Sequence, residues 1–369
     1  MLERLDPQLK PQEVANRNKL QETKPRAYEK IIKFDEKYRR GESIAIIQFQ
    51  YDYTCNFHCE HCSIKKFQVK KGADKDRRAF AMDDVRKLSR QADEMGLGRF
   101  VITGGEPLVF KDFDVLVEAI DPSKFYLNCD TNGWRLDEER AKHLKAIGVD
   151  RIQLSLDSLN PEEHDNFRKA KGAHARAIKA VENALNAELT IFIQTVVTKQ
   201  RLYSDEFIQF VEHFNKLGIG VFVSYAKPVG AWEGNFDGLV TKDDMKYFEQ
   251  LEKKYQLFSH LTPAYGLNMG CIAVKGMISV THYGDVLPCP YIHISIGNVF
   301  NEPLKDIIQR GLDIKYFGEY VDTCLIAEDR HFIHEVVEKK VYGKPPPVPS
   351  SEVFTKEDKT KKPFNEQER

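Results

Sequence analysis

Apolar residues follow two different spacings between residues 44 and 225. Short runs of mostly apolar residues, typical of buried β-strands, occupy positions 44–49, 99–103, 125–129, 151–156, 190–197 and 220–225. Between them, apolar residues recur every three or four positions over 83–95, 113–120, 138–147, 161–187 and 205–217, as in amphipathic helices. This pattern predicts six strands, each but the last followed by a helix.

Strands that alternate with helices favour a parallel sheet with right-handed crossovers. Six such units are fewer than the eight that close a full barrel, so we expect an α/β fold built as an open, partial TIM-like (βα)6 barrel. The carboxyl ends of its strands should surround one cleft, because that edge carries the chemistry in parallel α/β proteins.

The pattern also predicts the organisation of the remaining chain. Residues 1–42 predict a helical N-terminal lead-in with Tyr28, Ile31, Ile32 and Phe34 on one apolar stripe, and residues 43–228 form the barrel. A helical linker over 229–267 leads to a smaller domain, a β-hairpin plus helices, over 268–342. Residues 343–369 are rich in proline and charge, and predict a flexible tail that is mobile or lies over the barrel.

Composition narrows the class of protein. The chain has 369 residues, of which 41% are hydrophobic and 30% charged, and no apolar run approaches the roughly 18 residues that span a bilayer. The N-terminus has no signal-peptide pattern, so we expect a cytoplasmic protein. A formal net charge of −1 provides no field for attracting nucleic acid or an anionic membrane, so we expect neither as a partner.

Seven cysteines in a reducing compartment indicate metal ligands or buried thiols rather than disulfides. Cys55, Cys59 and Cys62 follow the first strand with C-x3-C-x2-C spacing. A four-iron cluster normally takes four protein ligands, so three thiolates would leave one iron open to another molecule. The alternative is a zinc site completed by His58 or His61. Cys129 lies alone in an apolar segment, as a core residue would.

Polar residues stand at the ends of successive predicted strands. Gly104-Gly105-Glu106-Pro107 follows the second strand, where glycines permit close approach of the backbone and Glu106 can accept hydrogen bonds from an ammonium group. Residues 130–133, which include Asn132, follow the third strand, and Ser155 and Asp157 follow the fourth. Buried polar groups need partners, so these positions predict a ligand-binding rim.

The cysteine spacing, the Gly-Gly-Glu-Pro segment and the six βα units, in this order, resemble the radical S-adenosylmethionine (SAM) superfamily over residues 44–228. This resemblance implies that Cys55, Cys59 and Cys62 hold a [4Fe-4S] cluster whose open iron is chelated by SAM. An external one-electron donor of flavodoxin or ferredoxin type would then drive cleavage of SAM to a 5′-deoxyadenosyl radical, which abstracts a substrate hydrogen. The resemblance also implies a SAM-binding set: His61, Gly104, Gly105, Glu106, Pro107, Asn132, Ser155, Asp157 and Arg168.

A second set of cysteines lies downstream. Cys271 and Cys289 flank an alternating segment with a central turn, which predicts a hairpin that brings the two thiols together, and Cys324 follows the next helix. The C-x12-G-x4-C spacing and the Pro-Cys-Pro sequence resemble the SPASM domain, or its shortened twitch form, over residues 268–326. A full SPASM domain has more cysteines. We therefore expect one auxiliary [4Fe-4S] cluster, its open iron bound by substrate, water, or a side chain such as His282, His293 or Asp322. A zinc site or buried cysteines are the alternative.

These inferences predict an enzyme whose substrate lies between the barrel mouth and the auxiliary cluster. Tyr225, Lys227, Trp232 and Glu233 follow the last strand and are candidate substrate contacts. The short segment before the first strand leaves no room for a peptide-recognition domain, so we expect a small polar metabolite that undergoes oxidation, epimerisation or rearrangement. Modification of a peptide is the alternative. A non-catalytic iron–sulfur or zinc protein is a third possibility, and it predicts no cofactor rim.

Overall fold

The computed structural model describes residues 11–68, 77–263 and 267–366. Its main sheet has ten strands in the order β11-β9-β8-β1-β2-β3-β4-β5-β6-β7. The six strands expected from the sequence form its parallel centre: β1 (Ile46–Asp52), β2 (Arg99–Gly104), β3 (Tyr126–Thr131), β4 (Arg151–Ser155), β5 (Thr190–Val197) and β6 (Gly220–Tyr225). The expected partial barrel is thus confirmed.

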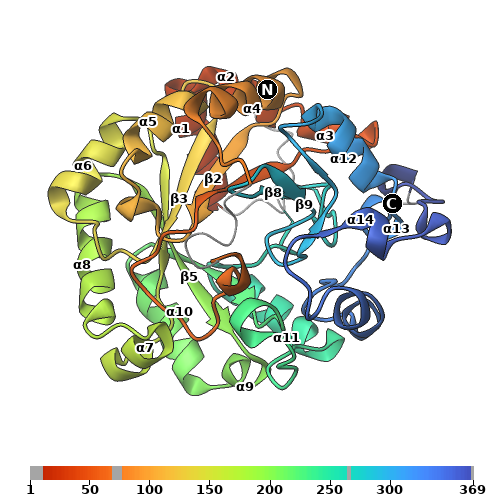
Figure 1. Ribbon diagram of the computed structural model, residues 1–369. Helices are drawn as coiled ribbons and strands as arrows, with labels where there is room; N and C mark the ends of the chain where they lie inside the picture. Colours follow the sequence, from red (N-terminus) through yellow and green to blue (C-terminus); the bar gives the residue numbers. More distant parts are fainter. Residues whose placement is uncertain (1–10, 69–76, 264–266, 367–369) are drawn as a thin grey trace.

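Helices cover the outside of this sheet, while the strands curve around the middle of the molecule (Figure 1). The outer layer contains α4 (Met82–Glu94), α5 (Phe113–Ile120), α6 (Glu138–Ala146), α7 (Pro161–Arg168), α8 (Ala173–Asn186), α9 (Lys199–Leu202) and α10 (Asp205–Lys216). Side chains at the helix starts satisfy free backbone N–H groups: Asp137 accepts from Arg140 N and Ser204 from Phe207 N. These two helices, α6 and α10, therefore begin where the periodicity predicts.

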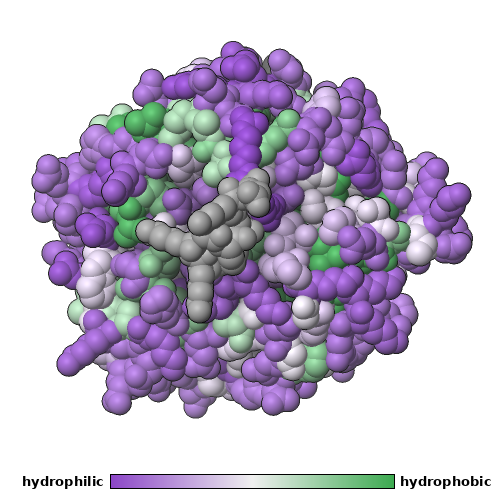
Figure 2. Space-filling view, viewed as in Figure 1, coloured by the Kyte–Doolittle hydropathy of each residue, from purple (hydrophilic) through white to green (hydrophobic). Residues whose placement is uncertain are grey.

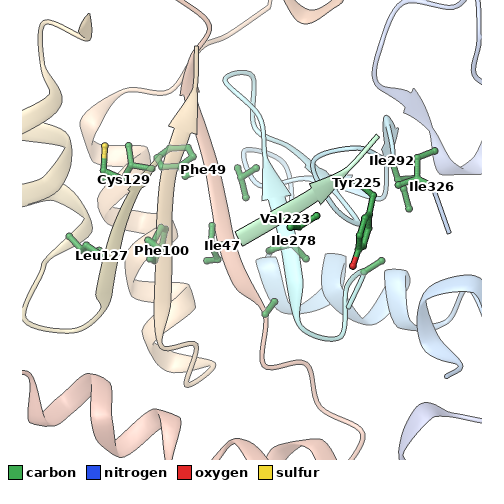
Figure 3. Close-up of a cluster of buried hydrophobic side chains, with 14 of the residues drawn as sticks. Ile47, Phe49, Phe100, Leu127, Cys129, Val223, Tyr225, Ile278, Ile292 and Ile326 are labelled. Carbon is green, nitrogen blue, oxygen red and sulfur yellow. The ribbon is translucent and has the colours of Figure 1, made fainter. Parts of the chain in front are cut away.

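Figure 3 shows buried side chains that join the barrel to the C-terminal region. Ile47 and Phe49 alternate along β1, and both are fully buried. Cys129 is also fully buried, as expected for a core cysteine, and burial raises the pKa of its thiol well above the ordinary value. The core therefore occupies the layer between strands and helices and leaves the strand ends for polar residues.

One predicted helix is wrong. Residues 161–187 form two helices, α7 and α8, because Lys169 and Gly172 adopt left-handed backbone conformations with φ of 50° and 83°. The carboxylate of Asp165 stabilises this break by accepting hydrogen bonds from Gly172 N and His174 N. The break leaves Arg168 as the last residue of α7.

The C-terminal region extends the same sheet instead of forming a separate one. The predicted hairpin is present as β8 (Met277–Val280) and β9 (Asp285–Leu287), and β8 pairs in parallel with β1. The short β11 (Gly297–Asn298) pairs with β9, and β7 (Leu257–Phe258) pairs with β6 at the opposite edge. The elements between and after these strands are α11 (Lys242–Lys254), α12 (Leu304–Leu312), α13 (Lys315–Gly318) and a π-helical segment, Phe332–Glu338. The auxiliary region is therefore continuous with the barrel.

The N-terminal lead-in is helical where it is described, with α1 (Pro11–Thr23), α2 (Pro25–Ile31) and α3 (Phe34–Arg39). Ile31 and Phe34 are buried, but Ile32 is 54% exposed and does not belong to the predicted apolar stripe. One turn of helix separates residues by three or four positions, so two consecutive residues cannot face the same core.

Residues 343–366 lie against the rest of the protein, so of the two alternatives for the tail the structure disagrees with mobility for this part. β12 (Val348–Pro349) pairs with β10 (Ile294–Ser295), and α14 (Ser350–Val353) follows. Phe364 is 3% exposed, and its ring contacts Tyr38 of α3 at a centroid distance of 5.1 Å. A few apolar side chains therefore hold a mostly polar segment against the body of the protein.

The face of the molecule drawn in Figure 2 is mainly hydrophilic, with hydrophobic residues in small groups. Within the described part of the chain, no helix is both long and apolar enough to cross a membrane.

Candidate active site

A polar cleft of about 180 Å³ lies at the carboxyl ends of the barrel strands. Most predicted site residues line it: Cys55, Cys59, His61, Cys62, Gly104, Gly105, Glu106, Asn132, Ser155, Arg168, Tyr225, Lys227 and Trp232. Pro107, Asp157 and Glu233 do not line it. Positions that are far apart in the sequence are thus gathered on one concave surface.

The first cysteine trio lies on an irregular loop that follows β1. Cys62 N donates to Cys59 O over 3.3 Å, and Phe57 N donates to the Cys55 Sγ over 3.4 Å. Burial raises the pKa of Cys55 to about 12 and that of Cys62 to about 11, and nearby thiols of the same trio add to both shifts. These thiols are therefore protonated near neutral pH. The positive charge of a metal centre would be needed to convert them to thiolate ligands.

Gly104 and Gly105 bring the end of β2 against the cysteine loop. Gly105 N donates to Asp52 O over 2.8 Å, and Glu106 N donates to Thr54 O over 2.9 Å. A Cβ atom on Gly104 would lie 2.2 Å from Asp52 O, and one on Gly105 would lie 2.0 Å from Thr54 O. The glycines therefore permit a close approach between two backbone segments of the site, in addition to lining the cleft.

Glu106 joins the ends of two strands. Its carboxylate accepts hydrogen bonds from Thr131 Oγ1 at 2.5 Å, Asn132 N at 2.7 Å and Leu108 N at 3.1 Å. Burial raises the pKa of Glu106 to about 7, although these hydrogen bonds oppose the shift. Pro107 begins a short 3-10 turn, Pro107–Val109, and is buried behind the cleft.

Arg168 and Asp157 form a buried ion pair beside the cysteine loop. Arg168 Nε donates to Asp157 Oδ2 over 2.6 Å, and Val196 N donates to Asp157 Oδ1 over 2.9 Å. Burial alone would raise the pKa of Asp157, but the Arg168 charge, the hydrogen bond from Val196 N and other nearby groups together outweigh it and hold that pKa well below its usual range. Asp157 thus orients Arg168, which lines the cleft near Cys59.

His61 belongs to an aromatic corner. Its ring stacks on Phe167 at a centroid distance of 4.4 Å, and Trp232 meets it edge-on at 5.9 Å. Burial, with the charge of Arg168, lowers the pKa of His61 to about 3, so the imidazole is neutral. A neutral aromatic ring at this place suits a nucleobase, as the superfamily resemblance implies.

The loop after β6 closes over the cysteine loop. Ala231 N donates to Cys62 O over 2.9 Å. Glu233 does not line the cleft, and it forms an ion pair with Lys66 at 2.5 Å. The Tyr225 ring packs against Phe248 and His260 in the core, although the residue also lines the cleft, and its role as a substrate contact stays a prediction. Lys227 and Trp232 remain on the cleft wall.

The second cysteine trio lies close to the same cleft. Cys271 and Cys324 are buried. Cys271 N donates a hydrogen bond to Val321 O over 2.7 Å, and this bond holds the segment before Cys324 next to Cys271. Burial raises the pKa of Cys289 to about 12 and also raises the pKa of Cys324. The neighbouring Cys271 adds to both shifts in the same direction. Pro290 and Tyr291, which follow Cys289, line the cleft itself.

Comparisons with known proteins identify both halves of this arrangement. The family model of the radical SAM superfamily matches residues 52–214, and that of SPASM, an iron–sulfur cluster-binding domain, matches residues 271–325. The chain belongs to the radical SAM superfamily. It is therefore a radical SAM enzyme with a C-terminal SPASM domain, which implies a [4Fe-4S] cluster with SAM and an auxiliary iron–sulfur cluster.

Several characterised proteins are similar to this radical SAM enzyme. The AdoMet-dependent heme synthase of Methanosarcina barkeri is 26% identical over 71% of the chain and 81% of its own length. The mycofactocin maturase MftC of Mycolicibacterium smegmatis is 28% identical over 72% of the chain and 70% of its own length. Probable GTP 3′,8-cyclase of Methanosarcina acetivorans is 41% identical, but over only 28% of the chain and 30% of its own length.

Solved structures share the fold at low sequence identity. SuiB of Streptococcus suis, bound to its precursor peptide SuiA, has a TM-score of 0.59 and 19% identity, covering 74% of this chain and 66% of SuiB. anSMEcpe with bound AdoMet has a TM-score of 0.55 and 17% identity, covering 72% of this chain and 80% of that structure.

The three thiols of each trio are close enough to act on one another. A zinc ion holds its ligands at about 2.0–2.3 Å and so requires them close together. Across residues 11–68, 77–263 and 267–366, no three Cys, His, Asp or Glu side chains are gathered tightly enough for a single metal ion. The members of each trio nevertheless influence one another electrostatically. Three cysteines in electrostatic contact fit a [4Fe-4S] cluster, which is held by cysteine thiolates.

The side chains considered for the open iron of the auxiliary cluster have other surroundings. His282 Nδ1 lies 2.5 Å from Tyr51 O, beside the first loop. Asp322 is an exposed residue that pairs with Lys242 at 3.3 Å. The His293 ring meets Phe67 edge-on at 4.9 Å. The identity of a fourth ligand therefore stays a prediction.

Sequence reasoning missed Phe167 and Tyr291. Phe167 lies in the last turn of α7, and its stacking on His61 joins segments that are about 100 residues apart, which no local pattern reveals. Tyr291 stands two positions after Cys289, in the motif that was recognised, and its proximity to Ser224 was not visible. Its hydroxyl lies 3.0 Å from Ser224 Oγ, which joins the Cys289 loop to β6.

Proposed function

We propose that this radical SAM enzyme abstracts a hydrogen atom from a small polar organic substrate bound between the first cysteine trio and the auxiliary trio. One observation supports the proposal most strongly. Residues of both regions line the same cleft, with Cys59 on one wall and Tyr291 on another. A substrate in this cleft would therefore lie within reach of both cofactors.

The chain provides a group for each part of SAM. Cys55, Cys59 and Cys62 would hold the first cluster, which with SAM supplies a 5′-deoxyadenosyl radical when bound. Glu106 and the backbone near Gly105 would accept from the methionine ammonium, and Arg168, oriented by Asp157, would bind its carboxylate. His61 and Trp232 would contact the adenine, while Asn132 and Ser155 would donate to or accept from the ribose or methionine.

The wall of the cleft favours a polar substrate. The polar residues beyond the proposed SAM groups include Gln48, Gln50, Gln68, Thr103, Asp130, Gln194, Ser224, Lys227 and Tyr291. Asp130 accepts a hydrogen bond from Asn128 Nδ2 at 2.9 Å, and burial raises the pKa of its carboxyl to about 7. Near neutral pH such a carboxyl can donate or accept a hydrogen bond, and side chains of this kind orient small substrates.

Modification of a peptide is a second candidate, and specific relatives favour it. The chain resembles a mycofactocin maturase at 28% identity, and it shares its fold with SuiB bound to a precursor peptide. The loop after β6 would then have to open to admit a peptide backbone, because Ala231 is bonded to Cys62 in the closed arrangement.

Substrate-stimulated cleavage of SAM tests these candidates. The enzyme would be assayed under anaerobic conditions with an external one-electron donor of flavodoxin or ferredoxin type, the kind expected in the cytoplasm. Pools of small carboxylic acids, amino acids and sugars would be compared with peptides encoded near its gene. A rise in 5′-deoxyadenosine with a mass change in a small molecule supports the proposal. A mass change only in a peptide supports the second candidate and excludes the first.

A further inference from the structure

Lys227 occupies an unusual position in the cleft. It follows β6, is 6% exposed and lines the cleft wall. Its Nζ donates to Tyr225 O over 2.8 Å and to Ser224 Oγ over 3.1 Å, and it lies 4.1 Å from the centroid of the Tyr291 ring. These contacts hold the ammonium group at one fixed place.

The hydrogen-bond acceptors of Lys227 are all neutral. Arg168, the guanidinium on the same cleft, pairs with Asp157, whereas Lys227 has no carboxylate partner among the described residues. Burying an ammonium group without an opposite charge is costly, so an anion near this place would stabilise it strongly. A hydroxyl, a carbonyl and an aromatic face offset only part of that cost.

The auxiliary trio is close enough to act electrostatically on this ammonium group. As thiolate ligands, Cys324 and Cys289 would favour the charged form of Lys227. The geometry gives the same relationship, because Tyr291, which contacts Nζ, follows Cys289 by two residues. The Tyr291 hydroxyl also lies 3.0 Å from Ser224 Oγ, which itself accepts from Lys227. Lys227 thus lies on the cleft wall and contacts the segment that carries Cys289.

We infer that Lys227 is a positioning residue that stabilises the reduced auxiliary cluster through its fixed positive charge, and so couples that cluster to the substrate cleft. One-electron reduction adds one negative charge to the cluster. A buried cation beside two of its ligands stabilises that added charge, because screening by water is weak in the interior. The inference rests on the proposed function only in assigning the cleft to substrate.

Redox titration of the holoenzyme tests this inference. Wild type and Lys227→Met are titrated with dithionite in the presence of mediators, and the two cluster signals are followed by electron paramagnetic resonance. The spectrum of a Cys55, Cys59 and Cys62 triple alanine variant identifies the auxiliary signal. We expect Lys227→Met to shift the auxiliary midpoint to lower potential, and Lys227→Arg to return it toward wild type. The first cluster should keep its midpoint.

Lys242→Met is the matched control. Lys242 pairs with Asp322, which precedes Cys324 by two residues. Its side chain is 67% exposed, so solvent screens its charge. Its loss should leave the auxiliary midpoint unchanged. If Lys227→Met does not retain the cluster, Lys227→Gln, which keeps a hydrogen-bond donor without the charge, is titrated instead.

An auxiliary midpoint that is unchanged in the charge-free variant overturns the inference, as does an equal shift in Lys242→Met. These outcomes differ from a failure of the proposed function. In that case the wild-type enzyme would show both cluster signals and the Lys227-dependent shift, but no substrate would stimulate cleavage of SAM.

Discussion

Arg168 Nε donates to Asp157 Oδ2 across 2.6 Å, and the two side chains are among the most buried charged groups beside the cleft. Asp157 itself does not line the cleft, so it acts on the site by holding Arg168. Arg168 is the last residue of α7, and the chain turns directly after it, where Lys169 adopts a left-handed conformation.

Breaking this pair should destabilise the protein and weaken SAM binding. Asp157→Asn leaves the Arg168 guanidinium buried without its counter-charge, which costs about 3–5 kcal/mol of unfolding free energy. Urea unfolding measures the loss, and equilibrium binding of SAM measures the second effect. Lys142→Met is the control, because the Lys142–Glu138 pair is exposed and should contribute less than about 1 kcal/mol. Equal losses in the two variants would contradict the assignment.

Gly230→Ala should disturb the first cluster. A Cβ atom there would lie 2.3 Å from Cys62 O and 2.4 Å from Ser63 O, and the residue has a φ of 64°. The loop after β6 must then move away from the cysteine loop, and we expect reduced iron content and weaker visible absorption after reconstitution. Gly234→Ala has the same backbone strain, with a φ of 78°, but nothing within 4 Å. It should retain its iron, and an equal loss in both variants would argue against a role for the contact.

Glu106 predicts a pH dependence of stability. Its pKa is about 7 in the folded protein, against about 4.3 in an unfolded chain, so the folded state holds a proton that the unfolded state has lost between these values. The contribution of Glu106 to the free energy of unfolding is therefore fully present below about pH 4.3 and is lost as the pH rises through 7. We expect thermal unfolding midpoints at equal cluster content to fall between pH 5 and pH 7, and to fall less in Glu106→Gln.

The exposed Glu138 provides the comparison for that experiment, since Glu138→Gln removes a carboxylate that is 58% exposed and paired only with Lys142. The unfolding midpoint of Glu138→Gln should fall with pH as much as that of the wild type. If the midpoint of Glu106→Gln falls equally, the Glu106 carboxyl is ionised in the folded protein throughout this pH range.

Phe364 should contribute to stability although it lies close to the C-terminus. It is 3% exposed and packs on Tyr38, so Phe364→Ala is expected to cost about 3 kcal/mol of unfolding free energy, measured with urea. Leu217→Ala, at a position that is 51% exposed, should cost less than about 0.5 kcal/mol. A similar small loss at Phe364 would restore the expectation of a mobile tail.

Local patterns predicted the barrel well and its long-range pairings poorly. The bounds of β5 and β6 follow directly from their apolar runs, since each run is buried and ends at a polar residue or turn. The parallel pairing of β8 with β1 joins residues about 230 positions apart, and no local periodicity contains that information. The break at Lys169 was hidden because the apolar spacing continues across it.

The same division holds for the site. The spacing of Cys55, Cys59 and Cys62 indicates a cluster loop because the ligands are neighbours in sequence. The stacking of Phe167 on His61 and the contact of Lys227 with Tyr291 depend on how distant segments fold together. In the tail, composition predicted mobility, but three apolar side chains, Val348, Val353 and Phe364, are buried and hold it in place.

The most direct test of the account is the fate of SAM on the reduced protein. The anaerobically reconstituted chain is treated with dithionite and SAM, and 5′-deoxyadenosine and methionine are quantified beside Cys59→Ala as the control. We predict that the wild-type protein forms both products and that Cys59→Ala, which lacks one ligand of the first cluster, forms neither. Intact SAM on a fully loaded and reduced wild-type protein would contradict the account.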